Sequence, residues 1–92
     1  MADKLSGGAL VAKSLLKEDV KYVFSISGGQ INPIYKGLKE EGIEIITTRH
    51  EQAAGHAADG WAKTTLSPGV CLVTAGPGFS NVLPAVISAY YA

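Results

Sequence analysis

The chain has 92 residues, which is enough for one small domain, and its eight basic and eight acidic residues balance. This even charge excludes the basic stripe typical of nucleic-acid-binding proteins, and no run approaches the roughly 20 apolar residues of a membrane span. Hydrophobic residues make up 47% of the chain and charged residues only 17%, a composition that predicts buried surface beyond the fold of this segment itself.

The N-terminus and the single cysteine indicate a cellular compartment. The first residues, Met-Ala-Asp-Lys-Leu-Ser-Gly-Gly, are polar and lack the apolar region of a signal peptide. Cys71 lies in an apolar run without metal-ligand spacing around it, so we interpret it as a core residue in a reducing compartment. We therefore expect the protein to be cytoplasmic.

Helical and strand patterns alternate from the start of the chain. Residues 5–16 carry apolar side chains at helical spacing, whereas residues 20–26 are rich in β-branched and aromatic residues and predict a strand. Gly28–Gly29 interrupts this strand. Asn32–Pro33 has the chemistry of a helix start, and Gly42 is placed to end that helix.

The second half of the chain repeats the alternation. We expect a strand over residues 43–48, followed by a helix of small residues that ends near Thr64. Residues 65–69 form a predicted turn. A third strand over residues 70–74 then leads into a tight glycine loop over residues 75–80.

The last predicted helix covers residues 82–91, with Asn81 as its cap and Pro84 tolerated in its first turn. Strands separated by helices imply an α/β fold, in which a parallel sheet with right-handed crossovers is flanked by helices. Three strands leave two unpaired edges. We therefore interpret the chain as a piece of a larger α/β domain, or as a subunit that completes its sheet with a partner.

Glu51 is the strongest candidate for a chemical role. It stands where the second strand gives way to the small-residue helix, and open α/β sheets bind ligands at the carboxyl ends of their strands. Residues 53–58 are four alanines, a glycine and a histidine, so a backbone or a flat ligand can come close. A carboxyl group among apolar atoms can share a proton with a ring nitrogen. The alternative is an acid that only stabilises the first turn of a helix.

Two glycine loops are candidate ligand loops. Gly76-Pro77-Gly78 resembles the start of a dinucleotide fingerprint, but the third glycine of that pattern is replaced by Asn81. Both this loop and Ser27-Gly28-Gly29-Gln30 could equally serve turn geometry.

The remaining candidates favour structural roles. His50 and His56 are six residues apart and do not share a helix face in the manner of a zinc site, so we expect no metal site. Trp61 and the Tyr90–Tyr91 pair suit a core or an interface better than a cofactor site.

Taken together, three segments resemble thiamin diphosphate-dependent enzymes. Residues 49–62, Arg-His-Glu-Gln-Ala-Ala-Gly-His-Ala-Ala-Asp-Gly-Trp-Ala, are similar to the glutamate helix of that family. Residues 68–81 are similar to the segment that follows this helix, and residues 23–29 to the first strand and its glycine loop. The branch that the chain resembles most is the acetolactate synthase group, with oxalyl-CoA decarboxylase-like and 2-hydroxyacyl-CoA lyase-like enzymes as alternatives.

This resemblance implies that residues 1–92 are the N-terminal portion of a pyrimidine-binding domain, part of a larger flavodoxin-like domain. It implies that Glu51 is catalytic and holds the aminopyrimidine of thiamin diphosphate through its first ring nitrogen, and that Gln30 lies near the substrate. The other residues that it places beside the cofactor are Gly28, Gly29, Gly76, Pro77, Gly78 and Asn81.

The resemblance also implies partners. The family holds the diphosphate and Mg²⁺ in a second domain, through a Gly-Asp-Gly motif and a downstream Asn that this sequence lacks. One branch also uses FAD. The site forms between subunits of a homodimer or tetramer, so we expect the isolated chain to be inactive. The implied reaction is decarboxylation and carboligation of 2-oxo acids such as pyruvate, as in branched-chain amino acid biosynthesis.

Three alternatives stay open from the sequence. The chain could be a small subunit that pairs with a second chain bearing the diphosphate site. It could be a non-catalytic α/β interaction domain in which Glu51 is a helix-start acid. A nucleotide-binding Rossmann half is the third and weakest alternative.

Overall fold

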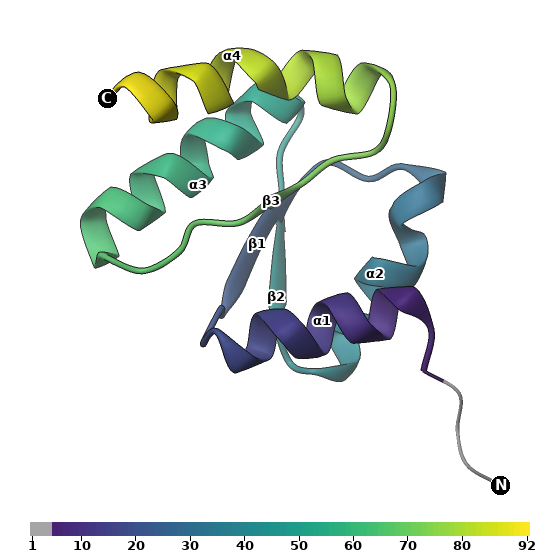
Figure 1. Cartoon of the computed structure of the whole chain (residues 1–92). Helices are drawn as coiled ribbons and strands as arrows, with labels where there is room; N and C mark the ends of the chain where they lie inside the picture. Colours follow the sequence, from purple (N-terminus) through teal and green to yellow (C-terminus); the bar gives the residue numbers. More distant parts are fainter. Residues whose placement is uncertain (1–4) are drawn as a thin grey trace, which may run out of the picture.

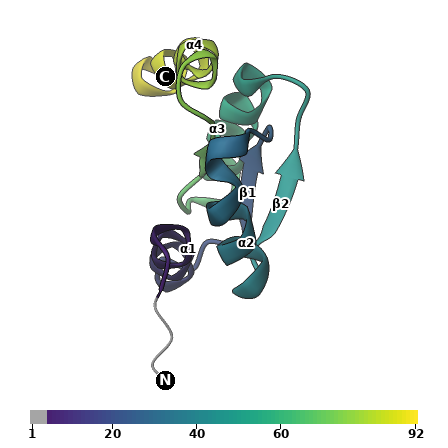
Figure 2. The same cartoon turned by 90° about the vertical axis from the view of Figure 1, so that its right-hand side faces the viewer.

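The computed structural model describes residues 5–92, so half of the polar N-terminal stretch used above lies outside the described residues. Four helices surround a three-stranded sheet: α1 (Gly7–Lys17), α2 (Asn32–Glu40), α3 (Glu51–Thr65) and α4 (Pro77–Tyr91). In Figures 1 and 2, α4 lies beside α3, on the opposite side of the molecule from α1. None of the helices in the described part is long and apolar enough to cross a membrane.

The sheet is parallel, as expected from the alternation of strands and helices. Its strands are β1 (Tyr22–Ser25), β2 (Glu44–Thr47) and β3 (Cys71–Leu72), in the order β2-β1-β3. A short 3₁₀ helix, η1 (Gly29–Ile31), follows β1. The predicted α/β fold is therefore confirmed, although β3 is shorter than the predicted strand over residues 70–74.

The central strand β1 has a core on each face because successive side chains of a strand point to opposite sides. On one face, Val23 packs with Ala12 of α1 and Leu38 of α2. On the other face, Phe24 packs with Ala54 and Ala58 of α3. The small residues of α3 thus let this helix lie close against the sheet.

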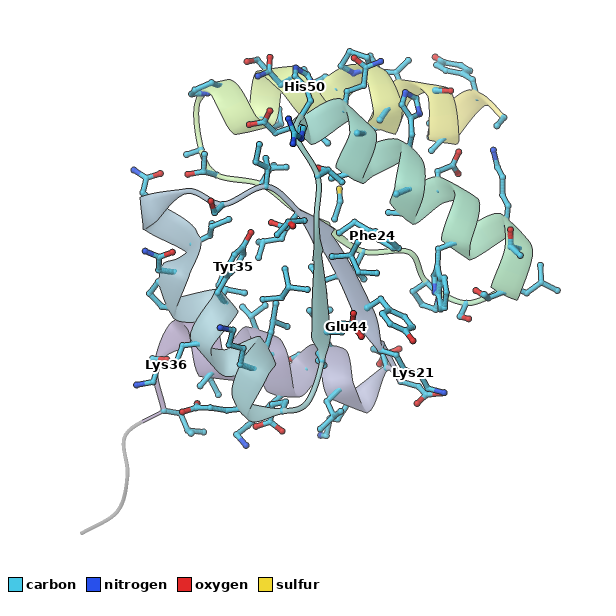
Figure 3. All side chains as sticks on the ribbon, turned by 180° about the vertical axis from the view of Figure 1, so that it is seen from behind. Lys21, Phe24, Tyr35, Lys36, Glu44 and His50 are labelled. Atoms are coloured by element: carbon cyan, nitrogen blue, oxygen red, sulfur yellow. The ribbon has the colours of Figure 1, made fainter. Side chains whose placement is uncertain are left out.

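A buried serine ties the central strand to its neighbours. Ser25 is fully buried, and its Oγ lies 2.6 Å from the hydroxyl of Tyr35, which points from α2 toward the sheet (Figure 3). The same Oγ donates to the carbonyl oxygen of Leu72 at 2.6 Å. The bond to Leu72 holds the end of β1 beside β3, where the backbone ladder is short, and the bond to Tyr35 ties the same strand to α2.

The last helix differs from the sequence prediction. It begins at Pro77 rather than at residue 82, so Asn81 is not its cap and Pro84 lies inside the helix rather than in its first turn. Pro77 takes the first helical position, where the missing N–H of proline costs nothing. Pro84 lacks the N–H that would bond to the carbonyl of Ser80, a loss that the rest of this apolar helix tolerates. Asn81 is therefore free to use its side chain elsewhere.

Candidate functional site at the carboxyl edge of the sheet

The three parallel strands end on one side of the sheet, which we call the carboxyl edge. The loop after β1 contains residues 28–30. The connection after β2 spans residues 48–50 and leads into the start of α3, and the segment after β3 spans residues 73–76 and leads into the start of α4. These segments, far apart in sequence, are thus brought to the same edge (Figure 1). This edge is where open α/β sheets place their ligands.

Glu51 is the first residue of α3 and is half-buried at this edge. The side-chain amide of Asn81 donates a hydrogen bond from Nδ2 to its Oε1 at 3.3 Å. An ionised carboxylate has about four lone-pair positions, so one such bond leaves acceptor capacity for a ligand. Two residues singled out by the sequence, Glu51 and Asn81, are therefore in direct contact.

His50 caps α3 and so fixes the position of the residue after it. Its ring Nδ1 accepts a hydrogen bond from the backbone N–H of Gln52 at 3.0 Å, and the hydroxyl of Thr48 donates to its carbonyl oxygen at 2.8 Å. Figure 3 shows His50 at the start of this helix. Histidine is not among the usual capping residues, which is why the sequence pattern did not predict this role.

Two of the candidate glycines lie where a larger residue would collide with Thr74. A Cβ on Gly28 would come within 2.7 Å of the Cβ of Thr74, and a Cβ on Gly78 within 3.1 Å of its Cγ2. Gly76 instead has a φ of 73°, a conformation that favours glycine. A Cβ on Gly29 would meet no other atom within 4 Å in the described chain, so packing there does not require a glycine.

Thr74 is a residue of this site that sequence reasoning missed. Its hydroxyl donates to Oε1 of Gln30 at 3.2 Å, which joins the end of β3 to the loop after β1. The available signal was its position directly after a strand and before the Gly76-Pro77-Gly78 loop. Threonine is also common in strands, so its presence at a strand end did not by itself predict a role in the site.

The small residues of α3 accommodate α4. A Cβ on Gly55 would lie 2.5 Å from the Cβ of Ala85 and 3.2 Å from Cγ2 of Val82. The sequence predicted that either a backbone or a flat ligand comes close to this helix, and at Gly55 the described chain places the backbone of α4 there. The close packing sets the distance between Glu51 and Asn81 because these residues lie on the two helices.

The aromatic residues divide into two groups. Trp61 packs at the sheet, with its ring centroid 4.9 Å from that of Tyr22 in an edge-to-face arrangement. Tyr90 and Tyr91, near the end of α4, are 79% and 80% exposed. Of the core and interface roles expected for these residues, Trp61 packs against the core, and Tyr90 and Tyr91 lie outside the core of this chain.

Cys71 is half-buried in β3, and burial raises the pKa of its thiol. The neutral thiol is therefore favoured near neutral pH, and we expect native Cys71 to react with a disulfide reagent at pH 8 more slowly than Cys71 of the chain unfolded in urea. Equal rates in the native and unfolded chain would contradict the burial effect.

The same burial makes stability depend on pH. Because the Cys71 thiol ionises at lower pH in the unfolded chain than in the folded chain, it should reduce the stability of the fold as the pH rises into the alkaline range.

Comparison with known proteins identifies the family. Residues 5–92 match the family model described as "Thiamine pyrophosphate enzyme, N-terminal TPP binding domain". The chain belongs to this family. The resemblance inferred from the sequence segments is therefore confirmed, and thiamin diphosphate is the cofactor of the family.

Similar proteins are acetolactate synthases. The large subunit IlvG of Mycobacterium tuberculosis is 47% identical over 88 residues, which cover 96% of this chain and 16% of that protein. The large subunit of Haemophilus influenzae is 48% identical over 88 residues, covering 95% of this chain and 15% of that protein. The isozyme 3 large subunit of Escherichia coli is 45% identical over 89 residues, which cover 96% of this chain and 16% of that protein. The chain thus spans about a sixth of the length of these relatives.

The residues at the carboxyl edge suit the pyrimidine end of the family's cofactor. A flat heterocycle with ring nitrogens needs a hydrogen-bonding partner and room for its faces. The half-buried carboxylate of Glu51 is a partner of this kind. At the same edge, the absence of side chains at Gly28 and Gly78 lets both loops pack closely against Thr74, so these segments lie near one another beside the end of the sheet.

Proposed function

We propose that this chain supplies the activating glutamate of a thiamin diphosphate-dependent enzyme of the acetolactate synthase type. The reaction is decarboxylation and carboligation of 2-oxo acids such as pyruvate. The observation that carries this proposal is the half-buried carboxylate of Glu51, which begins α3 at the carboxyl edge and accepts a hydrogen bond from Asn81. The names of the relatives favour this activity over an oxalyl-CoA decarboxylase or a 2-hydroxyacyl-CoA lyase.

With thiamin diphosphate bound, Glu51 would hold the aminopyrimidine through its first ring nitrogen and would share a proton with that nitrogen. The hydrogen bond from Asn81 engages Oε1 of Glu51 and would leave Oε2 for this contact. The remaining residues proposed to line the cofactor are Gly28, Gly29, Gly76, Pro77 and Gly78. The bound cofactor supplies an acidic thiazolium carbon and an electron sink for decarboxylation.

The rest of the proposed site lies outside this chain. We place the diphosphate and Mg²⁺ in a second part of the enzyme, which either continues the same polypeptide or belongs to a second chain. We call the two parts together the assembled enzyme, and we expect it to be a homodimer or tetramer in the cytoplasm. FAD could accompany thiamin diphosphate, as in one branch of the family.

The proposal is tested by titrating thiamin diphosphate and Mg²⁺ into this chain with and without the diphosphate-binding part. We expect hydrogen–deuterium exchange at the thiazolium carbon to accelerate, and pyruvate to be consumed, only when both parts are present. If the assembled enzyme binds the cofactor and leaves this exchange at the rate in free solution, the catalytic proposal is wrong. A non-catalytic α/β interaction domain would then be the better interpretation.

A further inference from the structure

The hydrogen bond between Thr74 and Gln30 orients a side-chain amide at the carboxyl edge. A glutamine amide has one acceptor oxygen and an NH₂ group with two donors. The Oε1 atom of Gln30 faces Thr74 and accepts its hydroxyl proton at 3.2 Å. Gln30 itself is exposed, so its NH₂ end is the end left for a ligand.

Thr74 is held firmly enough to impose this orientation. It is half-buried, and both glycine loops approach its side chain closely, at Gly28 and at Gly78. A β-branched side chain also has few accessible rotamers. The packing of this side chain therefore restricts the direction of its hydroxyl, and Oε1 of Gln30 is turned toward it.

The oriented amide is linked to Glu51 by a chain of contacts through the start of α4. Gly78 and Asn81 are three residues apart on α4, so they share one face of that helix. Gly78 approaches Thr74 at one end of this face, and Asn81 donates to Glu51 at the other. The start of α4 thus connects the amide of Gln30 with the proposed acid–base carboxylate.

Because the NH₂ group of Gln30 donates hydrogen bonds, it suits a substrate group that accepts them. A 2-oxo acid carries a carboxylate directly beside its reacting carbonyl group, and hydrogen bonds to an ionised acceptor are stronger than those between neutral groups. We propose that the amide NH₂ of Gln30 binds the carboxylate of the 2-oxo acid, and that Thr74 is a positioning residue that aims this amide. The inference rests on the function proposed above.

The first test replaces Gln30 by methionine, which keeps the length of the side chain and removes both donors. In the assembled enzyme we expect the KM for pyruvate to rise about tenfold or more, with a smaller change in kcat. Exchange at the thiazolium carbon, which needs no substrate, should keep the wild-type rate. The inhibition constant of methyl pyruvate, an ester without a free carboxylate, should not change.

The second test separates a positioning role of Thr74 from a structural one. We expect Thr74→Val to raise the KM for pyruvate about threefold, and Thr74→Ser, which keeps the hydroxyl, to restore it. The double variant Gln30→Met/Thr74→Val should be no worse than Gln30→Met alone because Thr74 acts through Gln30. Thr64→Val, at an exposed position of α3, is the matched control.

A third readout does not depend on activity. The chain contains two glutamines, so the side-chain amide of Gln52 is an internal reference for that of Gln30 in NMR spectra of the 92-residue chain. We expect Thr74→Val to shift and narrow the Gln30 amide signals as the side chain gains freedom, and Thr74→Ser to leave them in place. Unchanged signals in Thr74→Val would overturn the positioning role.

The outcomes distinguish this inference from the function on which it rests. A wild-type KM in Gln30→Met, together with normal exchange at the cofactor, would overturn the substrate role of Gln30 and leave the proposed function standing. Absence of accelerated exchange in the wild-type assembled enzyme would overturn the proposed function and this inference with it.

Discussion

Replacing Glu51 by glutamine should slow hydrogen–deuterium exchange at the thiazolium carbon by about a hundredfold or more in the assembled enzyme, the scale of positioned acid–base catalysis. Glutamine keeps the shape of the side chain, and its Oε1 can still accept the hydrogen bond from Asn81, but it cannot share a proton with the ring nitrogen. The exchange rate, followed by NMR in deuterated buffer, measures this loss directly.

The fold should survive this substitution. Glu51 stands in the first turn of α3, where an acid contributes only about 0.3–1 kcal/mol through the helix dipole, so urea unfolding should shift little. Glu44→Gln on β2 is the matched control because that carboxylate is exposed (Figure 3). Wild-type exchange in Glu51→Gln would remove the acid–base role and leave Glu51 as a helix-start acid.

Two glycines of the same helix should respond in opposite directions to alanine. Gly55→Ala places a methyl group against Ala85 and Val82, and we expect this overpacking to lower the free energy of unfolding by about 1–3 kcal/mol. A Cβ at Gly60 meets no other atom within 4 Å in the described chain. Gly60→Ala should therefore raise stability by about 0.5–1 kcal/mol through helix propensity. Urea unfolding, monitored by circular dichroism, measures the change in the free energy of unfolding of both variants.

A second substitution tests whether contact with α4 causes the loss of stability in Gly55→Ala. Ala85→Gly removes the methyl group that the new Cβ of Gly55→Ala would meet, so the double variant should regain part of the stability despite the glycine that it adds to α4. Additive losses in the double variant would show that the α3–α4 contact is not the cause. Because this contact sets the spacing between Glu51 and Asn81, Gly55→Ala should also slow exchange at the cofactor in the assembled enzyme.

Much of the fold could be predicted because the governing signals are local. The period of the apolar residues distinguishes helix from strand, and the glycine at position 42, with a φ of 76°, follows the end of α2 as expected. The position of Glu51 at a strand–helix junction is equally local. Its place at the carboxyl edge follows once the strands are parallel.

The start of α4 could not be predicted from local signals alone. Both Pro77 and Pro84 are compatible with the first turn of a helix, and the sequence does not decide between them. A helix that begins at Pro77 is compatible with the close packing of Gly78 against Thr74 and of Gly55 against Ala85. The prediction that Asn81 is a cap was wrong because this packing depends on the tertiary structure.

The sequence by itself determined the α/β class, the family and the placement of a carboxylate beside glycine loops, because these depend on residue type, period and spacing along the chain. Only the tertiary structure decided the strand order, the bond between Asn81 and Glu51 and the bond between Thr74 and Gln30. The partners in these two bonds are 30 and 44 residues apart. Contacts at that separation depend on how the helices pack on the sheet, and local preferences do not specify that packing.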